Sequence, residues 1–163
     1  MESVGAFCSF APGSDVVENH AIDYLSTSPF LYYGSEMNDV HTKKYSEYKL
    51  SGRFPGVIPK GSAHKLKKIS IGNDVWLGKN VTITNSANIG NGVIAGAGAV
   101  ITKDIPDYAV VVGVPARIIR YRYTKEQIET LNKIAWWNWT DEKIRECFDD
   151  FYLEIEKFIK KHK

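Results

Sequence analysis

Four histidines and two cysteines are the side chains of this sequence best suited to proton transfer, nucleophilic attack or metal binding. His20 follows Asn19 and precedes Asp23 in a short polar segment. A neutral imidazole titrates near neutral pH, so it can remove the proton of a hydroxyl group while that group attacks an electrophile. A histidine in such a place can also be structural, and the residue pattern by itself leaves both interpretations open.

The other candidate side chains are not spaced for a metal site or a disulfide framework. Cys8 and Cys147 lie far apart in unlike contexts, whereas zinc sites and disulfide frameworks need more cysteines at closer spacing. His41 and His64 have no second ligand at a metal-binding spacing. We therefore expect two reduced thiols, no metal and a cytoplasmic protein.

The composition is that of one soluble domain. The chain has 163 residues, of which 44% are hydrophobic and 25% are charged. A formal net charge of +2 is too close to balance to indicate binding to nucleic acid or to an anionic membrane. No apolar run approaches the roughly 20 residues that a membrane span requires. These features argue against a nucleic-acid-binding or membrane-spanning protein.

A repeat of six residues defines the elements that must position the candidate side chains. From Ile71 to Pro106 the sequence divides without a gap into IGNDVW, LGKNVT, ITNSAN, IGNGVI, AGAGAV and ITKDIP. Aliphatic residues occupy the first position, small residues the second, and small or β-branched residues the fifth. An amphipathic helix repeats near 3.6 residues and a half-buried strand repeats at 2, so neither explains this period.

The repeat predicts an all-β fold, a left-handed parallel β-helix with a triangular cross-section. Each unit supplies a short strand and a corner, so that about 18 residues complete one coil. The first position points inward, and the small second position lets the backbone turn. Asparagine tolerates left-handed backbone angles and is expected to adopt them at the corners. These corner asparagines are Asn73, Asn80, Asn85 and Asn91.

The remaining segments complete the predicted organisation. Residues 4–21 repeat the pattern weakly and predict one earlier coil, whereas residues 22–68 break it as a long protruding loop. We therefore expect a β-helix domain over residues 1–123 and a C-terminal helical extension over residues 124–163.

Two helices are predicted in the C-terminal extension. Thr124 and Gln127 form a capping-box pattern for a helix that ends near Trp136. A second helix is predicted to begin at Thr140 and to carry one apolar stripe as far as Ile159. These helices are expected to cover the open end of the stack of coils.

Four motifs connect this chain with a known group of proteins. They are Asn19-His20-x-x-Asp23 followed by Ser26-Thr27-x-Pro29-Phe30, IGNDVWLGKNV, GAGAVITKDIPDYAVVVGVPARIIR, and Trp136-Trp137-Asn138-Trp139. With these motifs the chain resembles, over nearly its whole length, the hexapeptide-repeat acyltransferases. Within them it is similar to the xenobiotic acetyltransferase branch, which includes streptogramin and type B chloramphenicol acetyltransferases and sugar O-acetyltransferases.

The resemblance implies a homotrimer that transfers acetyl groups from acetyl-CoA to a hydroxyl group, with His20 as the general base. It also implies that the active site lies between adjacent subunits. No candidate nucleophile pairs with His20 in the sequence, which favours direct transfer over an acyl-enzyme.

The resemblance also implies which residues contact the two substrates. The expected contacts with acetyl-CoA are Trp76, Gly78, Ala97, Gly98, Lys103, Arg117 and Arg120. Of these, the basic residues match phosphate-binding positions, although each can also be an ordinary solvated side chain. The expected contacts with the acceptor are Asn19, Asp23 and Tyr24.

Three hypotheses for the function follow. The first is O-acetylation of a sugar or polysaccharide precursor, and the second is O-acetylation of an antibiotic of the streptogramin or chloramphenicol type. The third is a non-catalytic β-helix that serves as a scaffold. His20 and the basic motifs argue against the third hypothesis, and the loop over residues 22–68 is expected to decide between the first two.

Overall fold

The computed structural model describes residues 3–17, 24–27, 69–84 and 87–163. The chain divides into two units, Met1–Val17 with Lys67–Lys163 and Glu18–Leu66. Only residues 24–27 of the second unit are described, and they form no helix or strand. The predicted loop, the first site motif and Asn85 therefore lie outside the described residues wholly or in large part.

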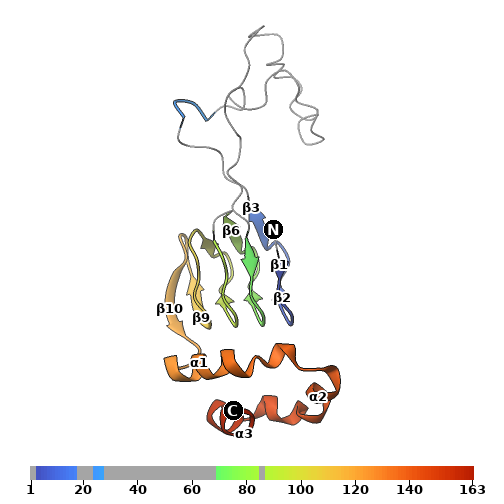
Figure 1. Cartoon of the computed structure of the whole chain (residues 1–163). Coiled ribbons are helices and arrows are strands. Elements are labelled where there is room, and N and C mark those ends of the chain that lie inside the picture. Colours follow the sequence, from blue (N-terminus) through green and yellow to red (C-terminus); the bar gives the residue numbers. More distant parts are fainter. Residues whose placement is uncertain (1–2, 18–23, 28–68, 85–86) are drawn as a thin grey trace. The chain divides into compact units, whose positions relative to one another are not determined.

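In the described residues of the first unit, ten short strands form three sheets in which neighbouring strands are parallel, with one antiparallel strand at an edge. From β1 to β6 successive strands visit the three sheets in turn, and in the later coils isolated bridges at Ile89 and Ile105 extend the pairing of β4, so the chain winds as a coil (Figure 1). One sheet has the order β10-β9-β7-β5-β2, another has the order β3-β6-β8, and β1 pairs with β4. The bounds are β1 Ser3–Val4, β2 Ser9–Phe10, β3 Asp15–Val17, β4 Ser70–Ile71, β5 Trp76–Leu77, β6 Thr82–Thr84, β7 Ile94–Ala95, β8 Val100–Ile101, β9 Ala109–Val112 and β10 Arg117–Tyr121.

The register between strands follows the repeat. Val4 pairs with Ile71, and Phe10 with Leu77, so the segment before the long insertion continues the same coil as the segment after it. The earlier coil predicted from residue 4 onward is therefore confirmed as far as Val17. The left-handed sense of the coil stays a prediction at this point.

The repeat positions determine the core as predicted. Between residues 71 and 106, every first-position residue is at most 3% exposed and every fifth-position residue is at most 7% exposed. These residues are Ile71, Leu77, Ile83, Ile89, Ala95, Ile101, Val75, Val81, Ala87, Val93, Ala99 and Ile105. A Cβ on the second-position Gly72 would lie 2.7 Å from the backbone nitrogen of Asn91, so only glycine fits where the coils approach there.

The prediction for the corner asparagines is right at one position and wrong at two. Asn80 adopts a left-handed conformation with a φ of 58°. At two other corners the left-handed residues are instead Asp74, with a φ of 55°, and Gly92, with a φ of 64°. Each directly follows a predicted asparagine, Asn73 or Asn91.

The side chains of these asparagines connect neighbouring coils, which explains their positions. Asn91 Oδ1 accepts hydrogen bonds from the backbone N–H and the Nδ2 of Asn73, each 2.9 Å long. Asp107 Oδ1 accepts from the backbone N–H of Asn91 at 2.7 Å. Asp107 Oδ2 accepts from Asn132 Nδ2 at 2.7 Å, so the ladder also ties the first C-terminal helix to the coil.

The C-terminal extension begins with the predicted helix. Helix α1 spans Lys125–Ile134, and both halves of its capping box form between Thr124 and Gln127. A 3₁₀ turn, η4, follows at Trp136–Asn138. The tryptophans of this turn and its end pack against the cluster that contains buried Phe158 and Leu131, as expected for residues at a helix junction. They are Trp136, Trp137 and Trp139.

The prediction of a single second helix is wrong, because the chain turns twice after Thr140. Helix α2 spans Asp141–Glu146, the 3₁₀ turn η5 spans Phe148–Tyr152, and helix α3 spans Ile155–His162 (Figure 1). Leu153 and Glu154 are extended, with ψ angles of 154° and 143°. This bend brings α3 back toward η5, where Asp150 binds its last residues. None of the described helices is long and apolar enough to span a membrane.

Candidate functional site

Trp76 projects from the outer face of the five-stranded sheet. It lies on β5, where its register partners are Ser9 and Ile94 on the neighbouring strands. Trp76 is 49% exposed, whereas the next residue, Leu77, is only 3% exposed and points into the core. The strand therefore presents a large aromatic surface to solvent.

A bulge places two arginines on the same outer face. In β10, Arg117 pairs with Val112 and Arg120 pairs with Val110, with a register shift between them. Without the bulge, residues three apart on a strand would face opposite sides. Because Val110 and Val112 share a face, both arginines lie on that face. Val110 is in register with Ile94, and Ile94 is in register with Trp76, so Trp76 lies on the same face. The fold thus brings Trp76, Arg117 and Arg120 to one side of one sheet.

Both guanidinium groups remain available to a ligand. Arg117 Nη1 donates to the carbonyl oxygen of Ala116 at 3.1 Å, and Arg120 Nη1 donates to that of Tyr121 at 3.3 Å. Both side chains are exposed, and β10 is exposed along its whole length. A guanidinium has five N–H donors, so a single backbone contact leaves most of each fork free to bind phosphate.

Gly78, Ala97 and Gly98 lie at the corners that follow β5 and β7. The backbone N–H of Gly78 donates to the carbonyl oxygen of Ala95, and that of Gly98 donates to the carbonyl oxygen of Lys79, each at 2.8 Å. These two donors serve the coil and are not free for a ligand. A Cβ on Gly98 would have nothing within 4 Å, so a ligand chain can approach the backbone of this corner closely.

The structure separates Lys103 from this group. Lys103 is exposed and lies in the bend after β8, at the opposite end of that strand from Gly98. The Trp76 face belongs to a different sheet. Within one copy of the chain, the basic residues expected to bind acetyl-CoA therefore form two groups.

The residues expected to contact the acceptor are almost entirely outside the described part of the chain. Asn19, His20 and Asp23 are not described, and Tyr24, which is 43% exposed, belongs to the second unit. Their roles stay predictions. The cysteine of the first coil is described: burial raises the pKa of the Cys8 thiol, and that thiol donates to the carbonyl oxygen of Gly72 at 3.2 Å. Cys8 is therefore a protonated structural residue at neutral pH.

Arg122 anchors the strand that carries the two outer arginines, a role that sequence patterns did not indicate. Its Nη1 donates to Asp74 Oδ2 and to the carbonyl oxygen of Gly92, each at 2.9 Å. Its guanidinium also lies over the rings of Tyr108 and Tyr123, at 5.4 and 5.3 Å from their centroids. Because Arg122 directly follows β10, these contacts fix the end of that strand against the corners of the coil.

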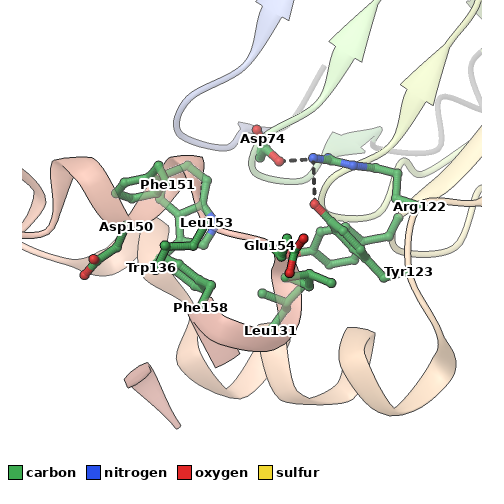
Figure 2. A pocket seen from close by; sticks show the side chains of 12 residues that line it. Asp74, Arg122, Tyr123, Leu131, Trp136, Asp150, Phe151, Leu153, Glu154 and Phe158 are labelled. Atoms are coloured by element: carbon green, nitrogen blue, oxygen red, sulfur yellow. Dashed lines mark hydrogen bonds and ion pairs between the residues drawn. The ribbon is translucent and has the colours of Figure 1, made fainter. Parts of the chain in front are cut away.

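Figure 2 shows this ion pair beside a pocket of about 580 Å³ between the coil corner and the C-terminal helices. Asp74 and Arg122 lie on the coil side, and Trp136, Leu131 and Phe158 lie on the helix side. The position of Asp74 directly after Asn73, at a predicted corner, was the one signal in the sequence, since a short polar side chain tolerates the left-handed backbone angles of a corner.

Replacement of Arg122 by methionine is expected to lower the free energy of unfolding by about 2–3 kcal/mol. The change keeps the side-chain length but leaves the Asp74 carboxylate, whose side chain is 30% exposed, without its cation. Urea unfolding of Arg122→Met, Asp74→Asn and the double variant forms the test. The double variant should be about 1–2 kcal/mol more stable than the sum of the single changes predicts; strict additivity would show that the pair contributes nothing.

Comparison with known proteins finds relatives over most of the chain, although no family model matches it. A probable macrolide acetyltransferase from Lysinibacillus sphaericus is 34% identical over 155 residues, which cover 93% of this chain and 74% of the relative. A chloramphenicol acetyltransferase from Klebsiella aerogenes is 32% identical over 146 residues. That match covers 87% of this chain but 61% of the relative, so the chain spans about three fifths of its length.

A shorter but closer similarity is confined to part of the chain. A galactoside O-acetyltransferase from Escherichia coli strain K12 is 45% identical over 65 residues, which cover 35% of this chain and 32% of the relative. The similarity to the macrolide and chloramphenicol proteins is thus longer, and the similarity to the galactoside protein is higher where it exists.

Proposed function

This chain belongs to the hexapeptide-repeat acyltransferases of the xenobiotic acetyltransferase branch, and we propose that it transfers an acetyl group from acetyl-CoA to a hydroxyl group of an acceptor. One observation carries the proposal. The bulge in β10 aligns Arg117 and Arg120 with Trp76 on one outer face, next to the open corner at Gly98. Such a face suits a long ligand with phosphates at one end and a thioester arm at the other.

The assembly that we propose is a trimer of left-handed coils, with each active site between two subunits. The separation of Lys103 from the Trp76 face favours this arrangement, because a neighbouring copy can present its Lys103 to the phosphates beside Arg117. A closed three-fold ring is a common outcome when one flat face packs against a different face of the next copy.

In the proposed reaction, His20 acts as the general base. The imidazole takes the proton of the acceptor hydroxyl while the oxygen attacks the thioester carbonyl of acetyl-CoA. The carbon–oxygen bond forms and the carbon–sulfur bond breaks, and the imidazolium returns its proton to the departing thiolate of CoA. The products are the acetyl ester and free CoA. Cys8 is not an alternative nucleophile, since its thiol is protonated and bound to a backbone carbonyl oxygen.

Two acceptor classes remain candidates. A sugar or polysaccharide precursor is the first, as the sequence predicts, and the galactoside relative supports it over 65 residues. A hydroxyl-bearing antibiotic is the second, and the length of the similarity favours it. The macrolide and chloramphenicol relatives match 155 and 146 residues of a chain in which the loop is expected to form the acceptor pocket.

The test is acetyl transfer to a panel of acceptors. Purified protein is incubated with acetyl-CoA and either simple galactosides, chloramphenicol, a macrolide or a streptogramin, and products are identified by mass spectrometry. We expect a mass increase of one acetyl group on members of one class, and no increase when the reactive hydroxyl is absent. No acetylated product from any acceptor, together with no binding of CoA, would instead support the scaffold hypothesis.

Arg117→Gln is expected to raise the Michaelis constant for acetyl-CoA by about 10- to 100-fold while the turnover number changes little. The substitution removes a charge-assisted contact with phosphate that is the same in the ground state and the transition state. Lys125→Gln, an exposed change at the start of α1, is the matched control and should leave both constants unchanged.

A thioester of pantetheine without phosphates separates this role from a structural one. The wild type and Arg117→Gln should use that substrate equally poorly if Arg117 acts on the phosphates. An equal loss of activity with both thioesters would contradict the assignment.

A further inference from the structure

Three metal-ligating side chains of different kinds meet in the C-terminal helices. Cys147 directly follows α2 as its C-cap, Asp150 lies in η5, and His162 is the last residue of α3. One ligand atom from each lies within 4.8 Å of the other two. In the described part of the chain, this is the one group of three such side chains that gathers in this way. Spacing along the chain predicts no metal site, but the turn at η5 brings these residues together.

The three ligand atoms lie near enough to one another to share one ion after small side-chain movements. Asp150 Oδ2 and His162 Nε2 lie 3.0 Å apart. Two ligand atoms bound to one zinc ion at bond lengths of 2.0–2.3 Å are about 3.5 Å apart. The carboxylate and the imidazole are closer than this spacing and must separate slightly to admit an ion, and the thiol, within 4.8 Å of both, must move toward them.

The surroundings hold the imidazole and the carboxylate in place. The side chain of His162 is 8% exposed and that of Asp150 is 11% exposed. The rings of Trp139 and Phe158 lie 4.9 and 4.7 Å from the imidazole centroid and restrict its rotation. Lys161 Nζ donates to the other carboxylate oxygen, Asp150 Oδ1, at 2.7 Å, which leaves Oδ2 facing His162. Outer contacts of this kind orient the ligands in metal sites.

We propose that Cys147, Asp150 and His162 bind one zinc ion, with water as the fourth ligand. A thiolate and an imidazole suit Zn²⁺, whereas Mg²⁺ and Ca²⁺ prefer sites made of oxygen atoms alone. Zinc binding replaces the hydrogen bond between His162 and Asp150 with bonds from both side chains to the ion, and the sulfur of Cys147 binds as a thiolate.

The ion would stabilise a part of the fold that buries little apolar surface. Helix α2 has no buried residue, α3 buries Phe158, and η5 buries Asp150. Short helices with so few core residues gain little from packing, and a metal ion that joins three such elements is an efficient substitute. A bound ion would therefore cross-link α3 to η5 and to the end of α2.

The test is titration of the full chain, freed of metal by a chelator, with Co²⁺ and Zn²⁺. We expect one equivalent of Co²⁺ to produce a thiolate-to-cobalt charge-transfer band and the visible spectrum of a tetrahedral site. Calorimetry should give one zinc per chain with a dissociation constant of about 1 µM or tighter. Zinc should also raise the melting temperature of α-helical structure, as measured by circular dichroism.

Matched variants make the result specific. Cys147→Ser and His162→Gln should weaken zinc binding about 100-fold, because each removes a direct ligand. Cys8→Ser removes the thiol of the first coil and should bind zinc as the wild type does. Absence of a charge-transfer band in the wild type, or binding that is unchanged in Cys147→Ser, would overturn the proposal and leave Asp150, Lys161 and His162 as an ion-pair network alone.

Discussion

Replacement of His20 by alanine is expected to lower the turnover number for acetyl transfer by about 10²–10⁴-fold. The loss follows from the general-base role, because a neutral hydroxyl is a poor nucleophile until its proton is removed. Affinity for acetyl-CoA should change little, since the expected contacts with that substrate, on the Trp76 face, at the neighbouring corner and at Lys103, do not include His20. Steady-state kinetics and calorimetric titration with CoA measure the two quantities separately.

A matched variant distinguishes catalysis from a structural role. His41→Ala alters another histidine of the second unit and should retain wild-type turnover. His20→Ala should also keep the melting temperature of the wild type and lose the pH dependence of its rate near neutral pH. If turnover is unchanged, or falls only in proportion to a loss of folded protein, His20 is a structural residue.

Gly92→Ala is expected to be among the most destabilising single changes in the coil, at about 3–4 kcal/mol. Gly92 has a φ of +64°, and a Cβ there would lie 2.4 Å from the ring of Tyr108, which is only 2% exposed. The left-handed backbone costs about 1–2 kcal/mol for a residue other than glycine, and forcing the buried ring aside adds about 1–3 kcal/mol.

Gly98→Ala separates these two contributions. Gly98 also has a left-handed backbone, with a φ of +72°, but a Cβ there meets nothing within 4 Å. Its free energy of unfolding should therefore fall by only about 1–2 kcal/mol. Denaturant unfolding of both variants measures the difference. Equal losses in the two proteins would mean that the contact of Gly92 with Tyr108 does not constrain the coil.

The fold was largely predictable because its signal is periodic. The first and fifth repeat positions, such as Ile83 and Val81, are completely buried, as their spacing predicts. The capping box at Thr124 was equally local and forms as predicted. The break of the second helix was not predictable from its apolar stripe. It depends on extended residues at Leu153 and Glu154 and on a carboxylate that binds a later helix.

The candidate site was predictable only in part, because its geometry depends on irregularities. The motifs identify Arg117 and Arg120, but a strand of regular register would place them on opposite faces, and the bulge is what aligns them. Asp74 lies within the six-residue repeat and Arg122 lies beyond its end, so the repeat does not indicate that the two side chains pair. Asn73 and Asn91 look like turn residues in the sequence, yet their side chains serve a ladder between coils.

The most direct test of the proposed reaction is the rate of CoA thiol release from acetyl-CoA as both substrate concentrations are varied. Direct transfer predicts that release requires the acceptor and that the double-reciprocal lines intersect, because both substrates must be bound together. Release of thiol at the same rate without acceptor, or parallel lines with acetylated protein accumulating, would contradict direct transfer from acetyl-CoA to the hydroxyl.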